Sequence, residues 1–307
     1  MTTTHAARGL AWIDMQSPTD DEIASVVNRY ALHPLVGEEL KDSPSLAKID
    51  FHKDYMLVVL TFPVRIKKGA SYEVVDREVD FVIGQNYLIT CHAEAIDQLE
   101  YFAKIFETNT ILNKDSKIEH IGHLFYYMIM RLYAGMYDDL ENIRDAIMSA
   151  ETHIFKGDER KMVEALSDLS RELIDFRETA RIHRDIWDDM IQFADKSFFG
   201  EDFGPYMRDI RDEFVRLNEL VLNARELVGD LRTTNDSLLN THQNDIIRTL
   251  TVINFIFIPA TFIASLFTIP APFVPIVGEP AGWTIIFLTM IIITVAIWFV
   301  LKRKRWL

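Results

Sequence analysis

The chain has 307 residues, of which 49% are apolar, and a formal charge of −14. The length suits one soluble domain plus a small membrane portion, and the negative charge argues against a nucleic-acid partner. The single cysteine, Cys91, excludes an internal disulfide and a cysteine-based zinc site within one chain. The N-terminus lacks the long apolar core of a signal peptide, so we expect the residues before the first span to stay where they are made.

Residues 1–94 are predicted to form an α/β cytoplasmic subdomain, a mixed sheet covered by helices. A helix is expected to begin with Pro18 at its first helical position and to end at His33-Pro34. A second short helix is expected to begin at His33-Pro34. Segments rich in Val, Ile, Phe and Tyr predict the strands Leu10–Asp14, Lys48–Phe51, Tyr55–Phe62, Val74–Ile83 and Tyr87–Cys91.

Residues 95–205 are predicted to form long cytoplasmic helices, the arms. Two amphipathic stretches, Lys117–Phe155 and Glu159 to about Ala194, exceed the usual helix length and predict an antiparallel pair. A stalk helix is expected over 206–249, because no proline occurs between Tyr206 and Pro259. Continued to Ile269, this helix would have about 64 residues and a length of roughly 95 Å.

Two charge-free apolar segments follow, each close to the roughly 20 residues that cross a bilayer as a helix. The predicted transmembrane helices are 250–269 and 283–301, joined by an external loop at 270–282. Arg248 and the basic tail at 302–307 flank the same side, and the positive-inside bias assigns that side to the cytoplasm. We therefore expect a multi-pass protein of the inner (plasma) membrane with both termini inside.

The first apolar segment contains a polar stripe. Steps of alternately three and four residues trace a heptad seam on one helix, and ten of its twelve positions are polar. The positions are Asp230, Thr233, Ser237, Asn240, Asn244, Ile247, Thr251, Asn254, Ile258, Thr261, Ser265 and Thr268. Because lipid-exposed polar groups are costly, the stripe must face water or a polar cavity. One helix cannot enclose a cavity, so the stripe predicts a symmetric oligomer around a central pore.

Several motifs together resemble the CorA-type divalent metal ion transporters, a two-span, pentameric family. They are Trp12-Ile13-Asp14, His33-Pro34-Leu35, Val79-Asp80-Phe81-Val82-Ile83-Gly84, Asn86-Tyr87-Leu88-Ile89-Thr90, Asn244, Leu250-Thr251, Ile258-Pro259-Ala260-Thr261-Phe262-Ile263-Ala264 and the closing basic-Trp-Leu. The resemblance covers nearly the whole chain. It implies a homopentameric funnel: an α+β cytoplasmic domain, long helical arms and stalk, and two transmembrane helices.

The resemblance and the polar stripe together assign candidate roles along the pore. The predicted pore-lining residues are Asn240, Asn244, Thr251, Asn254, Ile258, Thr261, Ser265 and Thr268. Leu250 and Ile258 match apolar constrictions of the family and are the predicted gate. Lys302, Arg303, Lys304 and Arg305 are the predicted basic collar. The alternatives are helix–helix packing for the hydroxyls, simple apolar surface for the gate, and membrane anchoring for the collar.

The chain departs from the family at the outer end of the pore helix. Thr268-Ile269-Pro270 stands where the family has its Gly-Met-Asn signature. The family's Asn presents amide oxygens to a hydrated ion, whereas proline has neither a side-chain amide nor a backbone donor. We call this triplet the divergent filter, and the family's magnesium selectivity is not carried over.

Asp209 and Asp212, near the start of the stalk, are candidate regulatory metal ligands. The resemblance implies that carboxylates between neighbouring cytoplasmic domains bind divalent ions, because like charges at an interface repel without a cation. The alternative is an exposed ion pair with the adjacent Arg208 and Arg211. The pair His120 and His123 has metal-compatible spacing but no obvious third ligand.

The sequence shows no phosphate-binding Gly loop, nucleophile elbow or zinc protease motif, so an enzyme and a bound cofactor are not expected. The favoured hypothesis is a homopentameric channel or transporter that conducts divalent cations (Mg²⁺, or Zn²⁺, Co²⁺ or Ni²⁺) down the electrochemical gradient, gated by its cytoplasmic domain. Its expected partners are the lipid bilayer, the cation and other copies of the chain. The alternatives are a zinc/proton-coupled transporter of the related branch, and a non-conducting membrane scaffold or sensor.

Overall fold

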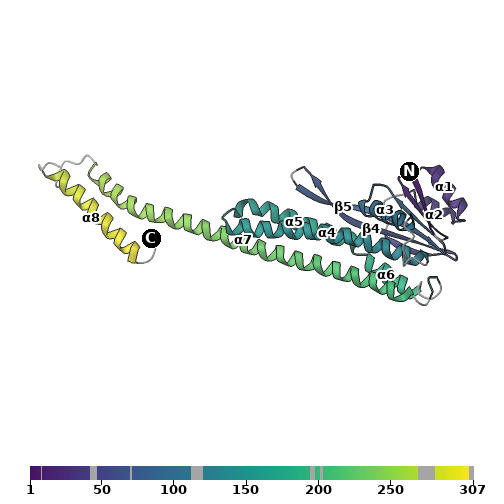
Figure 1. The fold of residues 1–307 in the computed structure, drawn as a ribbon. Helices are drawn as coiled ribbons and strands as arrows, with labels where there is room; N and C mark the ends of the chain where they lie inside the picture. The colour runs from purple at the N-terminus through teal and green to yellow at the C-terminus, as the bar shows by residue number, and fades with distance from the viewer. Residues whose placement is uncertain are drawn as a thin grey trace. The chain divides into compact units, whose positions relative to one another are not determined.

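The computed structural model describes residues 1–7, 9–41, 47–69, 71–111, 120–193, 198–200, 203–268 and 281–303. Its contacts divide the chain into two units, Met1–Arg232 and Thr233–Leu307. The first unit holds a sheet and most helices, and the second holds the two apolar segments (Figure 1).

A mixed six-stranded sheet organises the first unit, in the order β1-β2-β6-β5-β4-β3. Only β2 and β6 pair in parallel; the other neighbours are antiparallel. The strands are β1 (Thr2–Ala7), β2 (Leu10–Gln16), β3 (Lys48–Phe51), β4 (Tyr55–Lys68), β5 (Ser71–Gly84) and β6 (Tyr87–His92). The five predicted strands are confirmed, β4 and β5 running further along their shared hairpin. The edge strand β1, rich in Thr and Ala, was not predicted.

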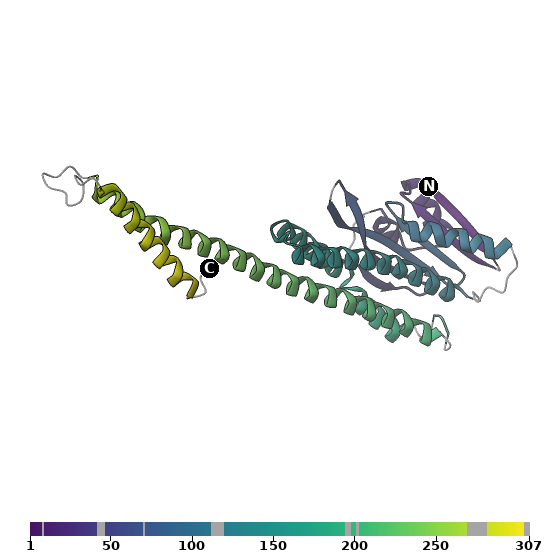
Figure 2. The ribbon, with the colours of Figure 1, turned by 60° about the vertical axis from the view of Figure 1, so that its left-hand side comes forward.

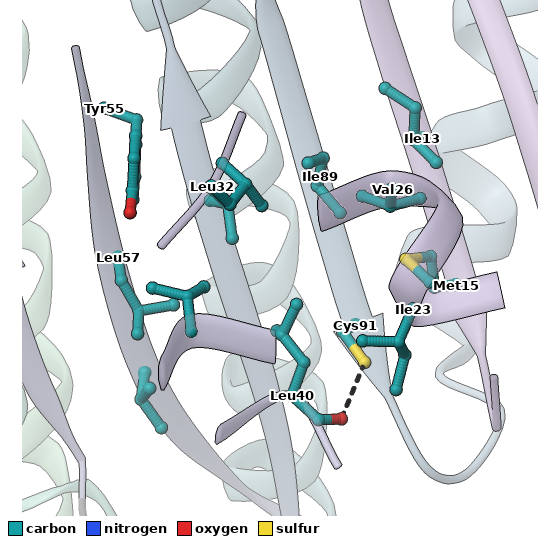
Figure 3. Close-up of a cluster of buried hydrophobic side chains, with 13 residues drawn as sticks. Ile13, Met15, Ile23, Val26, Leu32, Leu40, Tyr55, Leu57, Ile89 and Cys91 are labelled. Atoms are coloured by element: carbon teal, nitrogen blue, oxygen red, sulfur yellow. Dashed lines mark hydrogen bonds between the residues drawn. The ribbon is translucent and has the colours of Figure 1, made fainter. Parts of the chain in front are cut away.

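Two short helices cover one face of the sheet, α1 (Asp20–Arg29) and α2 (Pro34–Glu39). Figure 3 shows their side chains, among them Ile23 and Val26, packed on residues of β2, β4 and β6. The start of α1 corrects the prediction, because Thr19 is the N-cap and closes a capping box with Glu22, leaving Pro18 outside the helix.

The opposite face is covered by α3 (Asp97–Ile111) and α4 (Ile121–Phe155). Trp12 of β2 is fully buried and meets Phe102 and Phe106 of α3 edge-on. Its Nε1 donates to Thr90 Oγ1 at 2.9 Å, and that hydroxyl donates to Asp14 at 2.5 Å. The Trp-Ile-Asp motif is therefore explained by packing of the sheet.

The arms correspond to α4, α5 (Glu159–Ala180) and α6 (His183–Phe193). α5 packs on α4 and on the long β4–β5 hairpin (Figure 2). At that contact Arg65 Nε donates to Glu172 at 2.6 Å, and both side chains are more than nine-tenths buried. The hairpin and arms therefore share a buried ion pair.

The single helix predicted from Glu159 to about Ala194 is wrong, because a turn at Arg181–Ile182 divides it. The turn allows His183 to be fully buried, with Nε2 at 2.9 Å from Thr61 O and Nδ1 at 3.1 Å from the Tyr133 hydroxyl. Burial lowers the pKa of His183 to about 4. Amphipathic periodicity continues across the turn, which is why the sequence pattern did not reveal it.

The last two helices are α7 (Gly204–Leu266) and α8 (Gly282–Arg303). α7 has 63 residues and includes Pro259, which confirms that stalk and first apolar segment form one helix. Its predicted end at Ile269 is wrong, because residues 267–268 form a turn. Pro270 follows closely in the sequence, and helices usually end before the residue that precedes a proline.

Candidate functional site

The polar stripe lies on α7, and within the second unit its side chains are largely uncovered. Thr251 is half-buried; the other predicted pore-lining residues are exposed, as are both gate residues, Leu250 (58%) and Ile258 (64%). The pore-lining set is Asn240, Asn244, Thr251, Asn254, Ile258, Thr261, Ser265 and Thr268. Contacts from the rest of the described chain therefore leave most of this face uncovered.

The hydroxyl groups of the stripe donate their hydrogens to the helix backbone. Thr251 Oγ1 donates to Ile247 O at 2.7 Å, and Thr261 Oγ1 donates to Phe257 O at 2.8 Å. Ser265 Oγ likewise donates to a backbone carbonyl, at 2.9 Å. Because a hydroxyl has one donor and two acceptor lone pairs, each oxygen keeps acceptor capacity for a group outside the helix.

The apolar surface around the stripe is also uncovered. α7 and α8 are both long and apolar enough to cross a membrane, and only 6% of the apolar 18-residue stretch of each helix is buried. Large side chains such as Phe257 (65% exposed), Phe262 (62%) and Trp283 (74%) face outward. An exposed apolar surface of this extent marks a membrane or protein contact.

The two ends of the predicted pore are only partly described. Thr268 lies in the turn after α7, and its hydroxyl donates to Ser265 O at 2.8 Å. The other two residues of the divergent filter, Ile269 and Pro270, lie outside the described residues, as do Lys304 and Arg305 of the basic collar. Lys302 and Arg303 end α8, where Lys302 Nζ lies 4.9 Å from the centroid of the Trp298 ring.

The two candidate regulatory carboxylates differ in their surroundings. Asp209 is half-buried and accepts a hydrogen bond of 2.6 Å from the Tyr126 hydroxyl of α4. Burial and this hydrogen bond raise the pKa of Tyr126. Asp212 is exposed and accepts from Arg211 at 2.9 Å. A metal site between chains built on these carboxylates stays a prediction.

Within one chain, no group of three or more His, Cys, Asp or Glu side chains in the described ranges could hold a metal ion directly. His120 and His123 have ring centroids 3.9 Å apart, and His120 Nδ1 accepts from the Gly122 backbone at 3.1 Å. This contact makes His120 the N-cap of α4. Sequence reasoning missed the Tyr126 partner of Asp209, because its position 83 residues earlier leaves no local signal.

Comparisons with known proteins agree with this architecture. The cobalt/magnesium transport protein CorA of Thermotoga maritima is 23% identical, over 99% of this chain and 88% of that protein. The putative metal ion transporter YfjQ of Bacillus subtilis is 25% identical, over 96% of this chain and 89% of that protein. The complete structure of the CorA magnesium transporter from Methanocaldococcus jannaschii superposes with a TM-score of 0.83 at 19% identity, over 97% of this chain and 92% of that one. The structure of the full-length CmaX protein gives a TM-score of 0.71 at 18% identity, over 97% of this chain and 89% of that one.

The chain thus has the fold of a CorA-type protein, with a mixed-sheet domain, long helices and two apolar helices at the C-terminal end. Residues 7–303 match the family described as CorA-like Mg²⁺ transporter protein, and the chain belongs to this family. The predicted resemblance and fold class are confirmed. A family of membrane transporters also agrees with the prediction that the chain is not an enzyme.

Proposed function

We propose that the protein is a homopentameric channel that conducts divalent cations across the inner membrane down their electrochemical gradient. The observation that carries the proposal is the polar stripe, an uncovered row of polar side chains on a helix that is otherwise apolar enough to span a bilayer. Five copies of α7 around one axis remove this row from lipid and give it a common aqueous lumen. The outward apolar face of α7 then meets α8 and lipid.

Cation conduction is favoured by the oxygen atoms of the stripe. The hydroxyls of Thr251, Thr261 and Ser265 have their hydrogens on backbone carbonyls, so they offer acceptor lone pairs to the lumen. Such acceptors suit the water hydrogens around a hydrated cation, and Mg²⁺ loses its waters reluctantly. The formal charge of −14 further favours cations over anions.

The same geometry accommodates a gate. In a fivefold assembly Ile258 contributes a ring of apolar side chains to the axis, and Leu250 lies beside the stripe two turns earlier. Rings of this kind stop ion flow by dewetting when they narrow. The large first unit supplies the domain whose movement opens and closes them, with Asp209 as the candidate carboxylate at the subunit contact.

The orientation follows from the charges at the helix ends. Lys302 and Arg303 end α8, and Arg248 precedes the apolar part of α7. Basic residues favour the cytoplasmic side, which assigns both termini to the cytoplasm. α8 has 22 residues, or about 33 Å at 1.5 Å per residue, enough for a hydrocarbon core of about 30 Å.

Cation uptake into proteoliposomes tests this proposal. The full-length protein is reconstituted, an inside-negative potential is imposed, and uptake of Mg²⁺, Co²⁺, Ni²⁺ and Zn²⁺ is followed with an internal dye. The proposal requires uptake that increases with the potential and is absent from protein-free liposomes. Zinc uptake that follows a pH gradient instead would support the zinc/proton alternative. No uptake of any ion would leave the scaffold alternative.

A pair of substitutions examines the divergent filter. Thr268→Gly with Pro270→Asn restores the family's small residue and amide at the outer end of the pore helix. If an amide ring recruits hydrated Mg²⁺, the double variant should take up Mg²⁺ in preference to the other ions more strongly than the unmodified protein. An unchanged order of ions would show that selectivity in this chain is set elsewhere.

A further inference from the structure

A small cavity of about 160 Å³ lies in the first unit, and none of its lining residues belongs to the polar stripe. Residues before and within α1, the residues that follow α2, and parts of β5 and β6 line it. Figure 3 shows its apolar side, where Ile23, Leu40 and Cys91 lie close together. The polar side is formed by Asp20, Lys41, Glu78, Asp80 and His92. No role assigned so far uses this cavity.

Asp80 is the unusual member of this lining. It lies on β5 between Val59 of β4 and Cys91 of β6, and both of these neighbours belong to the apolar core cluster. Only 5% of Asp80 is exposed, and its Oδ1 is buried without a hydrogen-bond partner among the described residues. A buried carboxylate oxygen without a partner is costly to the fold, so the cavity lacks a group that this oxygen would bind.

The charges around Asp80 do not compensate it. Burial first, then the negative charges of Glu78 and Glu39, raise the pKa of Asp80 to about 8. The positive charge of Lys48 acts in the opposite direction on this pKa, but its ammonium group already lies 2.8 Å from both Glu39 and Asp50. A further positive charge inside the cavity would relieve this repulsion.

Lys41 also lines the cavity but forms ion pairs with other carboxylates. Its Nζ lies 3.8 Å from Asp20 and 3.6 Å from Glu38, and both of these side chains are well exposed. The ammonium group is therefore held at the rim by acids that face solvent. It lowers the negative charge of the entrance without supplying a partner to Asp80.

The softer ligand groups of the cavity are already occupied. His92 has Nδ1 at 2.6 Å from Glu94 O and Nε2 at 3.2 Å from Asp14. The Cys91 thiol donates to Leu40 O at 3.6 Å, and burial raises its pKa to about 12. The Asp80 Oδ1 atom has no such partner among the described residues, and carboxylate oxygens are the ligands of hard cations such as Mg²⁺ and Mn²⁺.

The dimensions fit a cation that keeps part of its water shell. Water takes up about 30 Å³ in the liquid, so 160 Å³ has room for an ion with a few water molecules. Mg²⁺ is commonly held by one or two carboxylates while it keeps several waters. This agrees with the lack of any group of three protein ligands in the part of the chain that the structure describes.

We propose that this cavity binds a partly hydrated hard divalent cation, with Asp80 and Glu78 of β5 as its carboxylate ligands. The site is formed within one chain, and does not require conduction through the polar stripe. Bound there, the cation and its water shell lie beside the residues that begin α1 and follow α2, because these residues line the same cavity. Cytoplasmic metal concentration would thereby set the stability of this end of the domain.

Cys91 provides a local probe of the proposal, because it is the single cysteine of the chain and lines the same cavity. In the full-length protein in detergent, a small methanethiosulfonate reagent reaches this buried thiol only when the region opens. Mn²⁺ bound to the closed form should slow modification, about tenfold at ten times its dissociation constant. Mg²⁺ should act in the same way.

Three variants decide whether the protection arises in the cavity. Asp80→Asn and Glu78→Gln keep side-chain size but remove charge, and each should abolish or strongly weaken protection by Mn²⁺. Asp209→Asn, outside the cavity, should keep it. Protection that survives in both cavity variants, or an absence of protection at every pH from 6 to 9, would overturn the proposal. The second result would mean that Asp80 is neutralised by a proton alone. Ion uptake is measured separately, so failure of conduction leaves this test intact.

Discussion

The buried imidazole of His183 predicts a specific acid sensitivity of the first unit. The ring lies among Phe62, Tyr133 and Trp187 and is fully buried. Trp187 Nε1 donates to the Tyr133 hydroxyl at 2.7 Å, and the ring nitrogens of His183 reach that hydroxyl and Thr61 O. A neutral imidazole satisfies this series of hydrogen bonds, because one ring nitrogen accepts and the other donates. A second ring proton would need a further acceptor.

The size of the effect follows from the pKa of His183, about 4 in the fold against 6.5 for a free imidazole. Above pH 6.5 both states are neutral, and the contribution to stability is fully present. As the pH falls from 6.5 towards 4, the unfolded chain takes up a proton that the folded chain does not, so stability is lost. Between pH 8 and pH 5 the loss is about 2 kcal/mol.

Denaturant unfolding of the full-length protein in detergent measures this loss when the original protein is compared with His183→Gln at both pH values. The variant is less stable at pH 8, because the network is disturbed, but it lacks the titrating group. The gap between the two proteins should therefore narrow by about 2 kcal/mol at pH 5. A gap that stays constant would refute the assignment of a neutral buried His183.

Two further outcomes are expected in the same domain. Glu172→Gln leaves the buried guanidinium of Arg65 without its counter-charge, so it should lower the free energy of unfolding by about 3–5 kcal/mol in denaturant unfolding. Adding Arg65→Met should recover part of that loss. A double variant no more stable than the single one would contradict this reasoning. Tyr126→Phe removes the hydrogen bond to Asp209 and should cost about 1 kcal/mol; an unchanged stability would mean that water replaces the hydroxyl.

The sequence predicted the elements whose patterns are strong and local. The two apolar segments are defined by the absence of charge over the length of a bilayer, and α7 and α8 confirm that both are helical. β3 was predicted with its observed bounds. β1 was missed because Thr2–Ala7 carries little apolar patterning and gains its structure from pairing with β2.

The candidate site was predictable only where one helix carries it. The polar stripe is a periodicity within α7, so counting residues was sufficient to find it. The environment of Asp80 was not predictable, because both faces of the sheet are covered and the strand pattern Val79-Asp80-Phe81 does not tell a buried carboxylate from an exposed one. The turn before His183 likewise depends on tertiary contacts with β4 and α4.

The most direct test of the central claim is Mg²⁺ uptake by Thr261→Leu, compared with Thr289→Leu. Both threonines lie in apolar helices, are exposed, and donate to a backbone carbonyl at 2.8 Å, but only Thr261 belongs to the polar stripe. Proteoliposomes should contain equal amounts of each protein in the same oligomeric state. A fivefold ring of leucine in the lumen should reduce uptake at least about tenfold, whereas Thr289→Leu should stay within about twofold of the original protein. Equal uptake by the two variants would contradict conduction along the stripe.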